Sequence, residues 1–152
     1  MHRLIKTILP MLAFAWAGTS EAATYYVRNG GNDSADGRTH ATAWASLNRV
    51  NSHAFAAGDS VLLQEGSRFD NQKLRVDWGG TATQRAVIGA YYLDGSTPRR
   101  GYRTARPTID GEDRIPTSHY DGLVVVAGVD RVRIENLQVM NSEGRAIGIA
   151  DS

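Results

Sequence analysis

The chain has 152 residues, of which 41% are hydrophobic, and this length is enough for one ordinary domain with a core of its own. Its formal net charge of +1 argues against a general nucleic-acid binder, which needs a basic face. It contains no cysteine, so disulfides and thiolate-based metal sites are excluded.

The beginning of the chain has the order of segments that is typical of a secretory signal peptide. The basic stretch MHRLIK precedes the apolar run TILPMLAFAWA, and the small residues of GTSEAAT follow it. The run is shorter than the about 20 residues that cross a bilayer. Cleavage after Ala22 would put Ser20 and Ala22 at the two small-residue positions. We therefore expect residues 1–22 to be a signal peptide, and residues 23–152 to be secreted or periplasmic without a membrane span; an uncleaved anchor or a buried N-terminal helix is the alternative.

The next segment is predicted to be a cap made of a strand, a polar loop and a helix. The strand covers Tyr25–Val27, and residues 29–37 are rich in Asn, Gly and Asp, which favour turns. Apolar residues then recur at helical spacing, with Thr42 as a plausible N-cap and an end near Asn51 or His53. The face of this helix that would cover the core consists of Trp44, Leu47 and Val50.

The polar loop is also a candidate calcium site. Asn32, Asp33 and Asp36 are close in sequence and carry oxygen ligands of the kind that calcium prefers. The loop lacks the spacing of an EF-hand and its distant bidentate Glu. A turn stabilised by Asn and Asp side chains is the alternative, and no other cofactor is evident.

Beyond this cap the sequence consists of short apolar segments between turns, without helical periodicity. These segments are typical of strands of three to five residues. The expected strands include Val61–Leu63, two in LRVDWGGTATQRAVIGAYY, one in RPTIDGE, and then GLVVVAG, VRI, LQV and AIGIADS.

The stretch RVRIENLQVMNS contains a slip in strand phase. Val132 and Ile134 alternate as on one face of a strand, but Leu137 and Val139 are one residue out of phase with them. All four can point inward only if the chain turns a corner between the two pairs. Asn136 lies at that point, and Asn tolerates the left-handed conformation that such a corner needs.

A second corner is expected at Asn141, and together the corners return the chain to its starting point. Val124 and Ala146 then begin equivalent segments, 22 residues apart, a period found in solenoids. This register also predicts the direction of individual side chains. Val132, Ile134, Leu137, Val139, Ile147 and Ile149 should point inward, and Arg131, Arg133 and Gln138 outward.

The expected fold class is all-β, a right-handed parallel β-helix (solenoid) with an N-terminal cap that contains a short α-helix. A β-sandwich would want longer strands and hairpin turns such as Asn-Gly. A doubly wound α/β sheet would need helices of about ten or more residues between parallel strands. Neither pattern is seen.

Several motifs resemble a known group of proteins. YYVRNGGNDSADGRT, AWASLNRVN, AGDSVLLQEG, GGTATQRAVIGAY and RPTIDGE are similar to the N-terminal region of secreted right-handed parallel β-helix proteins of the pectate-lyase-like superfamily. That group includes polysaccharide lyases resembling chondroitinase B and alginate lyases, and related epimerases. The resemblance covers nearly all of residues 23–152.

The resemblance implies the front end of a longer protein with many more coils. Residues 23–152 would be the cap and first coils of a truncated domain, inactive alone and monomeric at full length. The full protein would be a lyase or epimerase acting on an acidic polysaccharide. A non-catalytic β-helix adhesin or glycan-binding surface protein is the alternative, because the fold serves both.

Lyase chemistry needs a base, and a cation or strong donors for the developing charge. No motif here matches a catalytic residue of the family, so the catalytic residues are unknown. The best candidate for a glycan contact is the segment PRRGYRTARP, because Arg pairs with carboxylates and a Tyr ring can stack on a sugar. The candidate residues are Arg99, Arg100, Tyr102, Arg103 and Arg106; the alternative is a solvated loop balanced by Asp94, Asp110, Glu112 and Asp113.

A second candidate is TSHYDG, where His119, Tyr120 and Asp121 precede a strand. A His and a Tyr at the mouth of a solenoid could form an acid–base pair, and an ordinary loop is the alternative. Lys73 could be a base in principle, but nothing nearby in the sequence indicates a lowered pKa.

Overall fold

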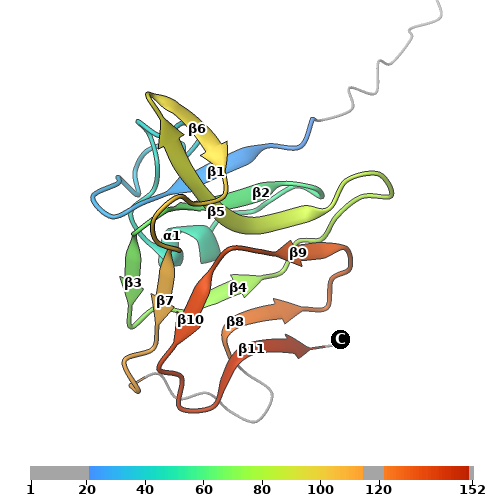
Figure 1. The fold of residues 1–152 in the computed structure, drawn as a ribbon. Coiled ribbons are helices and arrows are strands. Elements are labelled where there is room, and N and C mark those ends of the chain that lie inside the picture. The colour runs from blue at the N-terminus through green and yellow to red at the C-terminus, as the bar shows by residue number, and fades with distance from the viewer. Residues whose placement is uncertain (1–20, 115–121, 151–152) are drawn as a thin grey trace, which may run out of the picture.

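A computed structural model describes residues 21–114 and 122–150, in which strands predominate and the helix α1 is five residues long (Figure 1). Residues 1–20 of the predicted signal peptide and the His119 segment lie outside these ranges. The elements are β1 (Thr24–Val27), α1 (Leu47–Asn51), β2 (Ser60–Gln64), β3 (Arg68–Asp70), β4 (Leu74–Val76), β5 (Ala86–Asp94), β6 (Thr97–Arg100), β7 (Thr108–Asp110), β8 (Gly122–Ala127), β9 (Val132–Ile134), β10 (Gln138–Met140) and β11 (Arg145–Ala150).

The strands form three sheets that the chain visits in the same order on each pass. One sheet contains β1, β2, β5 and β9 in parallel, with β6 antiparallel to the end of β5. A second sheet has the order β10-β7-β3, and a third has the order β11-β8-β4, both parallel. The described chain is therefore mostly β, with a β-helix-like arrangement of stacked coils.

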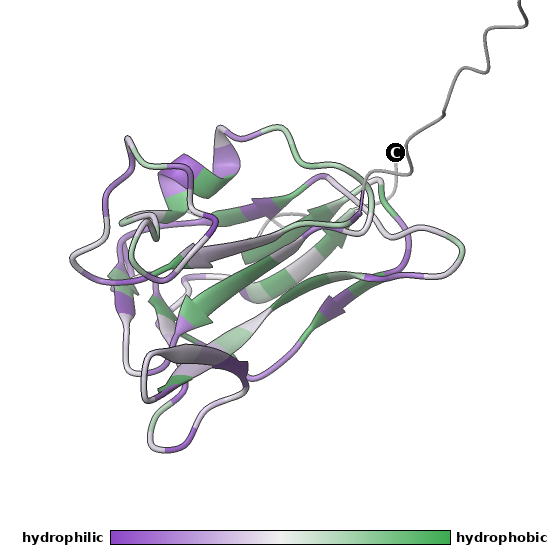
Figure 2. Ribbon diagram, turned by 90° about the horizontal axis from the view of Figure 1, so that it is seen from above, coloured by the Kyte–Doolittle hydropathy of each residue, from purple (hydrophilic) through white to green (hydrophobic). Residues whose placement is uncertain are grey.

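The register of the sheets stacks apolar residues in inward rows. In the first sheet Val61 pairs with Ile88 and Ile88 with Ile134, and in the second Phe69, Ile109 and Val139 are aligned in the same way. In the third sheet the rows are Leu74–Val124–Ile147 and Val76–Val126–Ile149. These rows meet in one hydrophobic cluster, and Figure 2 shows that the strands carry most of the apolar residues.

The corner predicted at Asn136 is confirmed. Its φ is 59°, and that of Asn141, at the next corner, is 52°. The turns between β2 and β3 and between β3 and β4 use the same device, with Gly66 at φ 73° and Asn71 at φ 53°. Residues that tolerate the left-handed region therefore turn the chain from one sheet to the next.

The predicted inward direction is confirmed for Val132, Ile134, Leu137 and Val139, which are partly buried against the core. The predicted repeat length of 22 residues was wrong by one. Val124 pairs with Ile147 and not with Ala146, so this circuit has 23 residues.

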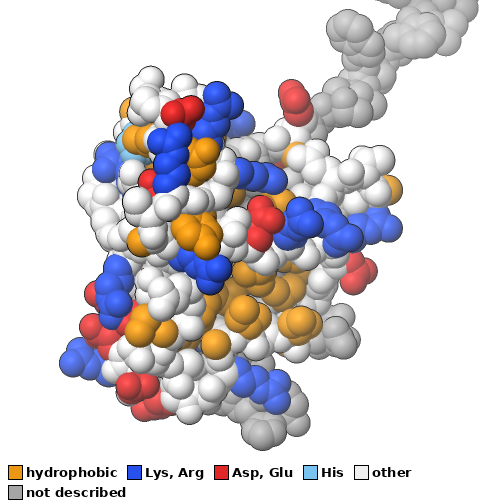
Figure 3. Space-filling view, viewed as in Figure 1, with side chains coloured by type: hydrophobic (Ala, Val, Ile, Leu, Met, Phe, Trp, Pro, Cys, Tyr) orange, Lys and Arg blue, Asp and Glu red, His pale blue; other side chains and the backbone are white. Residues whose placement is uncertain are grey.

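Ile147 and Ile149 continue the inward rows but are 47% and 75% exposed. No described strand stacks on β11 from the other side. Figure 3 shows hydrophobic side chains gathered in the region of β8, β9 and β11. They line a hollow made by Val126, Val129, Asp130, Arg131, Val132, Ile134, Ile147 and Ile149.

The cap differs from the prediction in its helix. The helix begins at Leu47 and its N-cap is Ser46, whose side chain accepts a hydrogen bond from Arg49 N, so the assignment of Thr42 was wrong. Thr42 instead bonds Thr39 in the preceding turn.

The expected apolar face of the cap is confirmed, because Leu47, Val50 and Trp44 are fully buried. Trp44 precedes the helix and bridges to Val27 of β1. Its ring stacks on Tyr25 at 5.1 Å between centroids.

The core assignment can be tested with the same substitution at two positions. Ile109→Ala should lower the free energy of unfolding by about 2–5 kcal/mol, because it empties the buried centre of a row. Ile149→Ala, at the exposed end of another row, should cost less than about 0.5 kcal/mol. Urea unfolding of residues 23–152, followed by circular dichroism, measures both, and equal losses would contradict the assigned stack.

Candidate functional site

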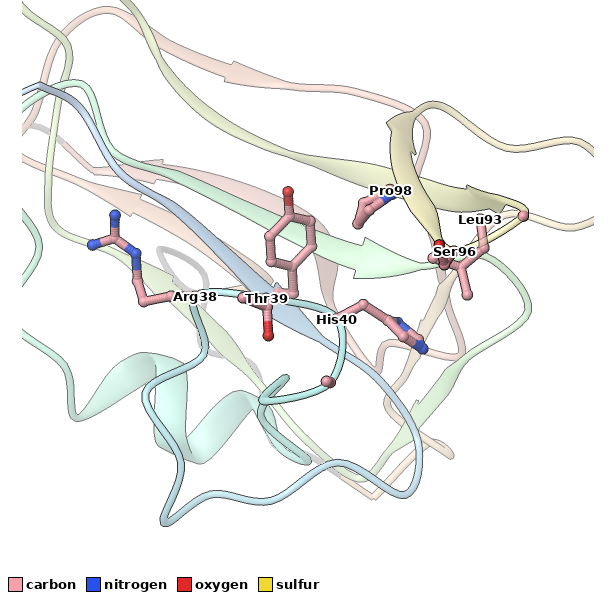
Figure 4. A pocket seen from close by; sticks show the side chains of 9 residues that line it. Arg38, Thr39, His40, Leu93, Ser96 and Pro98 are labelled. Carbon is pink, nitrogen blue, oxygen red and sulfur yellow. The ribbon is translucent and has the colours of Figure 1, made fainter.

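A surface hollow of about 550 Å³ lies between the loop 38–41 and the β5–β6 hairpin. Figure 4 shows Arg38, Thr39 and His40 on the loop side and Leu93, Ser96 and Pro98 on the hairpin side. The complete lining consists of Tyr26, Arg38, Thr39, His40, Ala41, Leu93, Gly95, Ser96 and Pro98.

The loop side of the hollow is fixed by contacts with the cap. Gly37 has φ 72° and lies so close to Trp44 that a Cβ there would be 2.6 Å from the indole ring. Only glycine fits this position without strain. Tyr26 N donates to Gly37 O at 2.8 Å, and Arg28 Nε donates to His40 O at 3.3 Å. The buried Trp44 therefore positions the loop that forms one wall.

The hairpin side exists because β5 extends beyond its neighbour in the next coil. Residues 86–88 of β5 pair with β9, whereas Tyr91–Asp94 pair with β6 in antiparallel register. The strand β6 was not predicted, because TPRR has no apolar alternation. Arg99 and Arg100 belong to this strand, so the arginine segment is not one continuous loop.

His40, in the loop 38–41, forms a hydrogen bond with Tyr91 of β5, with 2.9 Å between Nδ1 and the tyrosine hydroxyl. Burial of the Tyr91 ring raises the pKa of its hydroxyl, so the group keeps its proton. Burial, and next the charge of Arg28, lower the pKa of His40. The pair is therefore uncharged at neutral pH, and when Tyr91 donates to Nδ1 the imidazole presents Nε2–H as a donor.

The hollow combines an apolar wall with polar groups at one side. Leu93 and Pro98 are half-buried, and Tyr26 contributes an aromatic ring that packs edge-on against Tyr91. None of the described lining residues is Asp or Glu. Such a surface can bind a ring with one apolar face and hydroxyls at its edge, and it lacks the carboxylate pair that glycoside hydrolysis uses.

The five residues predicted to contact a glycan do not converge on one point. Arg103 Nη2 bonds Asp94 Oδ1 at 2.9 Å, and its guanidinium lies 4.3 Å from the centroid of Tyr92. Arg100 Nη2 donates to Ser60 Oγ at 3.1 Å. Asp94, which was named as a balancing charge, therefore does neutralise part of the segment.

Arg106 and Tyr102 form the outer part of the segment. The Arg106 guanidinium lies 5.2 Å from the centroid of the Tyr102 ring, which is 37% exposed. The loop that carries them is held by Glu65, whose carboxylate accepts hydrogen bonds from the backbone N–H groups of Arg103 and Thr104. The Arg103 bond is the largest cause that lowers the pKa of Glu65.

The oxygens of the candidate calcium loop serve a structural turn. Asp33 Oδ1 accepts from Ala45 N at 2.7 Å and Ser46 N at 3.0 Å, so it fixes the start of α1. Asn32 and Asp36 each accept from the backbone N–H two residues later. These are the contacts of the alternative interpretation, and no group of three or more His, Asp or Glu among the described residues is placed to hold a metal.

Asp110 was named only as a balancing charge for the arginine segment, but it is buried and bonds to other residues. Its carboxylate accepts from Glu112 N at 2.7 Å and from Asn141 Nδ2 at 2.9 Å, and it contacts the Arg68 guanidinium. The Glu112 bond is the largest cause that lowers its pKa. Asp110 therefore ties β3, β7 and the Asn141 corner together, which no local sequence signal could reveal.

Comparisons with known proteins point to carbohydrate-active enzymes. No protein-family model matches the chain. Lacto-N-biosidase of Bifidobacterium longum subsp. longum is 40% identical over 165 residues, which is 91% of this chain and 10% of that protein. The crystal structure of the GH136 lacto-N-biosidase from Eubacterium ramulus matches 76% of this chain at 29% identity with a TM-score of 0.59, and this covers 20% of that structure.

A rhamnogalacturonan lyase also matches 76% of this chain, with a TM-score of 0.54 at 19% identity, which shows a shared fold alone. The chain thus spans a small part of each relative. In the described ranges no helix is long and apolar enough to span a membrane. The comparisons support similarity to carbohydrate-active proteins of β-helix-like fold, and they do not support the narrower expectation of a pectate-lyase-like lyase.

The state of His40 gives a prediction about pH. Because its pKa is lowered in the folded chain, the unfolded chain takes up the proton first as the pH falls, so stability should decrease from about pH 7 through the ordinary histidine range. The pKa of His40 measured by NMR titration should lie below that range. His40→Gln should remove part of the pH dependence in urea unfolding. A pKa of His40 at or above the ordinary histidine value would contradict its pairing with Tyr91.

Proposed function

We propose that this chain forms the capped N-terminal end of a secreted, right-handed β-helix protein that acts on glycans as a glycoside hydrolase. The observation that carries this proposal is the 40% identity to a lacto-N-biosidase across 91% of the chain. The match to a second lacto-N-biosidase, in three dimensions and at 29% identity, supports it independently.

This proposal replaces the lyase or epimerase expected from the sequence motifs. The lyase neighbour is too distant to support more than a common fold. None of the relatives compared supports the adhesin alternative. Right-handedness is supported by the general preference for right-handed crossovers between parallel strands of one sheet, as in β2 and β5.

Within such a hydrolase, this part of the chain would contact the glycan and not cleave it. Hydrolysis in most families uses two carboxyl groups on either side of the scissile bond, and the described lining of the hollow contains none. Its volume of about 550 Å³ lies within the roughly 300–1,000 Å³ of ordinary ligand pockets.

The chemistry of the walls suits a sugar ring. The apolar face of a sugar can lie on Tyr26, Leu93 and Pro98, and hydroxyls at its edge can bond Thr39 and the imidazole of His40. An acidic substituent would find Arg38 at the rim, or Arg106 beyond the hairpin. The proposed glycan class therefore includes glycans with acidic substituents.

The reaction class can be tested on the full-length protein. Incubation with oligosaccharides that end in lacto-N-biose should release reducing sugar without ultraviolet absorbance from an unsaturated uronate. Alginate, chondroitin and pectin, assayed in parallel, should give no such absorbance. Absorbance that grows with time on any of the three would show a lyase and overturn the proposal.

The sugar-contact role can be tested by filling the hollow. Ser96→Trp should weaken binding of lacto-N-biose by about tenfold or more, because the indole occupies the space of the sugar. Thr83→Trp, on an exposed turn outside the lining, is the matched control and should bind as the unaltered protein does. Titration calorimetry measures both, and equal affinities would remove the hollow from the proposal.

A further inference from the structure

Asp59 is a buried carboxylate in the turn that leads into β2. Its side chain is involved in two hydrogen bonds, and the residue is only 2% exposed. Oδ1 accepts from the backbone N of Ala23 at 2.7 Å, and Oδ2 accepts from Ala56 N at 2.8 Å. Both donors are neutral amides in the uncleaved chain.

Both backbone polar groups of Ala23, its N–H and its carbonyl, are hydrogen-bonded. It is 8% exposed, and its carbonyl accepts from Ser60 N at 2.8 Å. The parallel pairing of β1 with β2 begins at the next residue, where Thr24 aligns with Ser60. The position of the Ala23 nitrogen is therefore set by the first sheet and by Asp59 together.

The carboxylate of Asp59 has no ion-pair partner among the described side chains. His53 is near enough to interact with its charge, but burial is the largest cause that lowers the pKa of His53, and its Nε2 has no hydrogen-bond partner. A buried carboxylate without a cation is costly, so a cation at this point would stabilise the fold.

We propose that cleavage between Ala22 and Ala23 creates that cation, because the new α-ammonium of Ala23 forms a buried ion pair with Asp59 and locks β1 onto β2. The inference rests on the secretion named in the proposed function. In the reaction a signal peptidase adds water across the Ala22–Ala23 bond. The C–N bond breaks, the hydroxyl goes to the Ala22 carbonyl, and the Ala23 amine takes one proton from water and a second from solvent at neutral pH.

The ion pair forms only if cleavage occurs directly before Ala23. A chain cut one residue earlier or later would place its ammonium away from Asp59, because Ala23 is fixed by Ser60. The precursor has only an amide at this point, so removal of the leader should strengthen the edge of the first sheet after export.

Amine reactivity in the exported protein tests this inference. Residues 23–152 contain one lysine, Lys73, and peptide mass spectrometry separates the α-amine of Ala23 from lysine side-chain amines. Each amine is compared between the native and the urea-unfolded protein. The α-amine of Ala23 should react about tenfold or more slowly in the native state, because it is reached only by local opening.

Two variants locate the cause of this protection. Asp59→Asn should remove most of the protection, because the amide cannot hold an ammonium as a carboxylate does. Asp77→Asn, which changes a half-exposed carboxylate paired with Arg75, is the matched control and should keep it. If Asp59→Asn does not fold, the inference is decided by the unaltered protein, from the ratio of α-amine reactivity in the unfolded state to that in the native state.

N-terminal sequencing of the same sample separates the possible failures. A mature start other than Ala23, or an α-amine that reacts as fast in the native as in the unfolded state, would overturn the inference. Protection that survives intact in a folded Asp59→Asn would overturn it as well. Each of these results leaves the glycan proposal standing, because that is decided by product analysis.

Discussion

The parallel register that aligns Val61, Ile88 and Ile134 is the constraint on which the rest of the structure depends. Each strand presents every second side chain inward, so a row stays apolar only if successive coils stack without a slip. The corners at Asn71, Asn136 and Gly66 preserve this alignment by absorbing changes of phase between sheets.

The same stacking explains where the candidate site lies. Because β9 ends at Ile134, just before a corner, only the first part of β5 is paired with the next coil. The rest of β5 continues outward and pairs with β6, which builds one wall of the hollow. The other wall rests on Trp44 through Gly37, so the cap that closes the core also shapes the surface.

The features that sequence could predict were those with a local signal. The corner at Asn136 followed from the change of phase between Ile134 and Leu137, and the burial of Leu47 and Val50 followed from their spacing. Partnerships across coils carry no local signal, so the Asp110 network and the His40–Tyr91 pair were not predicted. The one-residue error in the repeat arose in the same way, because pairing between strands, and not composition, sets the register of β11.

In the described residues, the stack is closed by the cap at one end and has exposed rows at the other. Amide hydrogen exchange in residues 23–152 expressed alone, resolved by residue, tests this arrangement most directly. The slowest exchange is expected in β2, β5, β7 and β8, which have partners on both sides, and faster exchange in β9, β10 and β11. Equal protection throughout, or stronger protection in β11 than in β2, would contradict it.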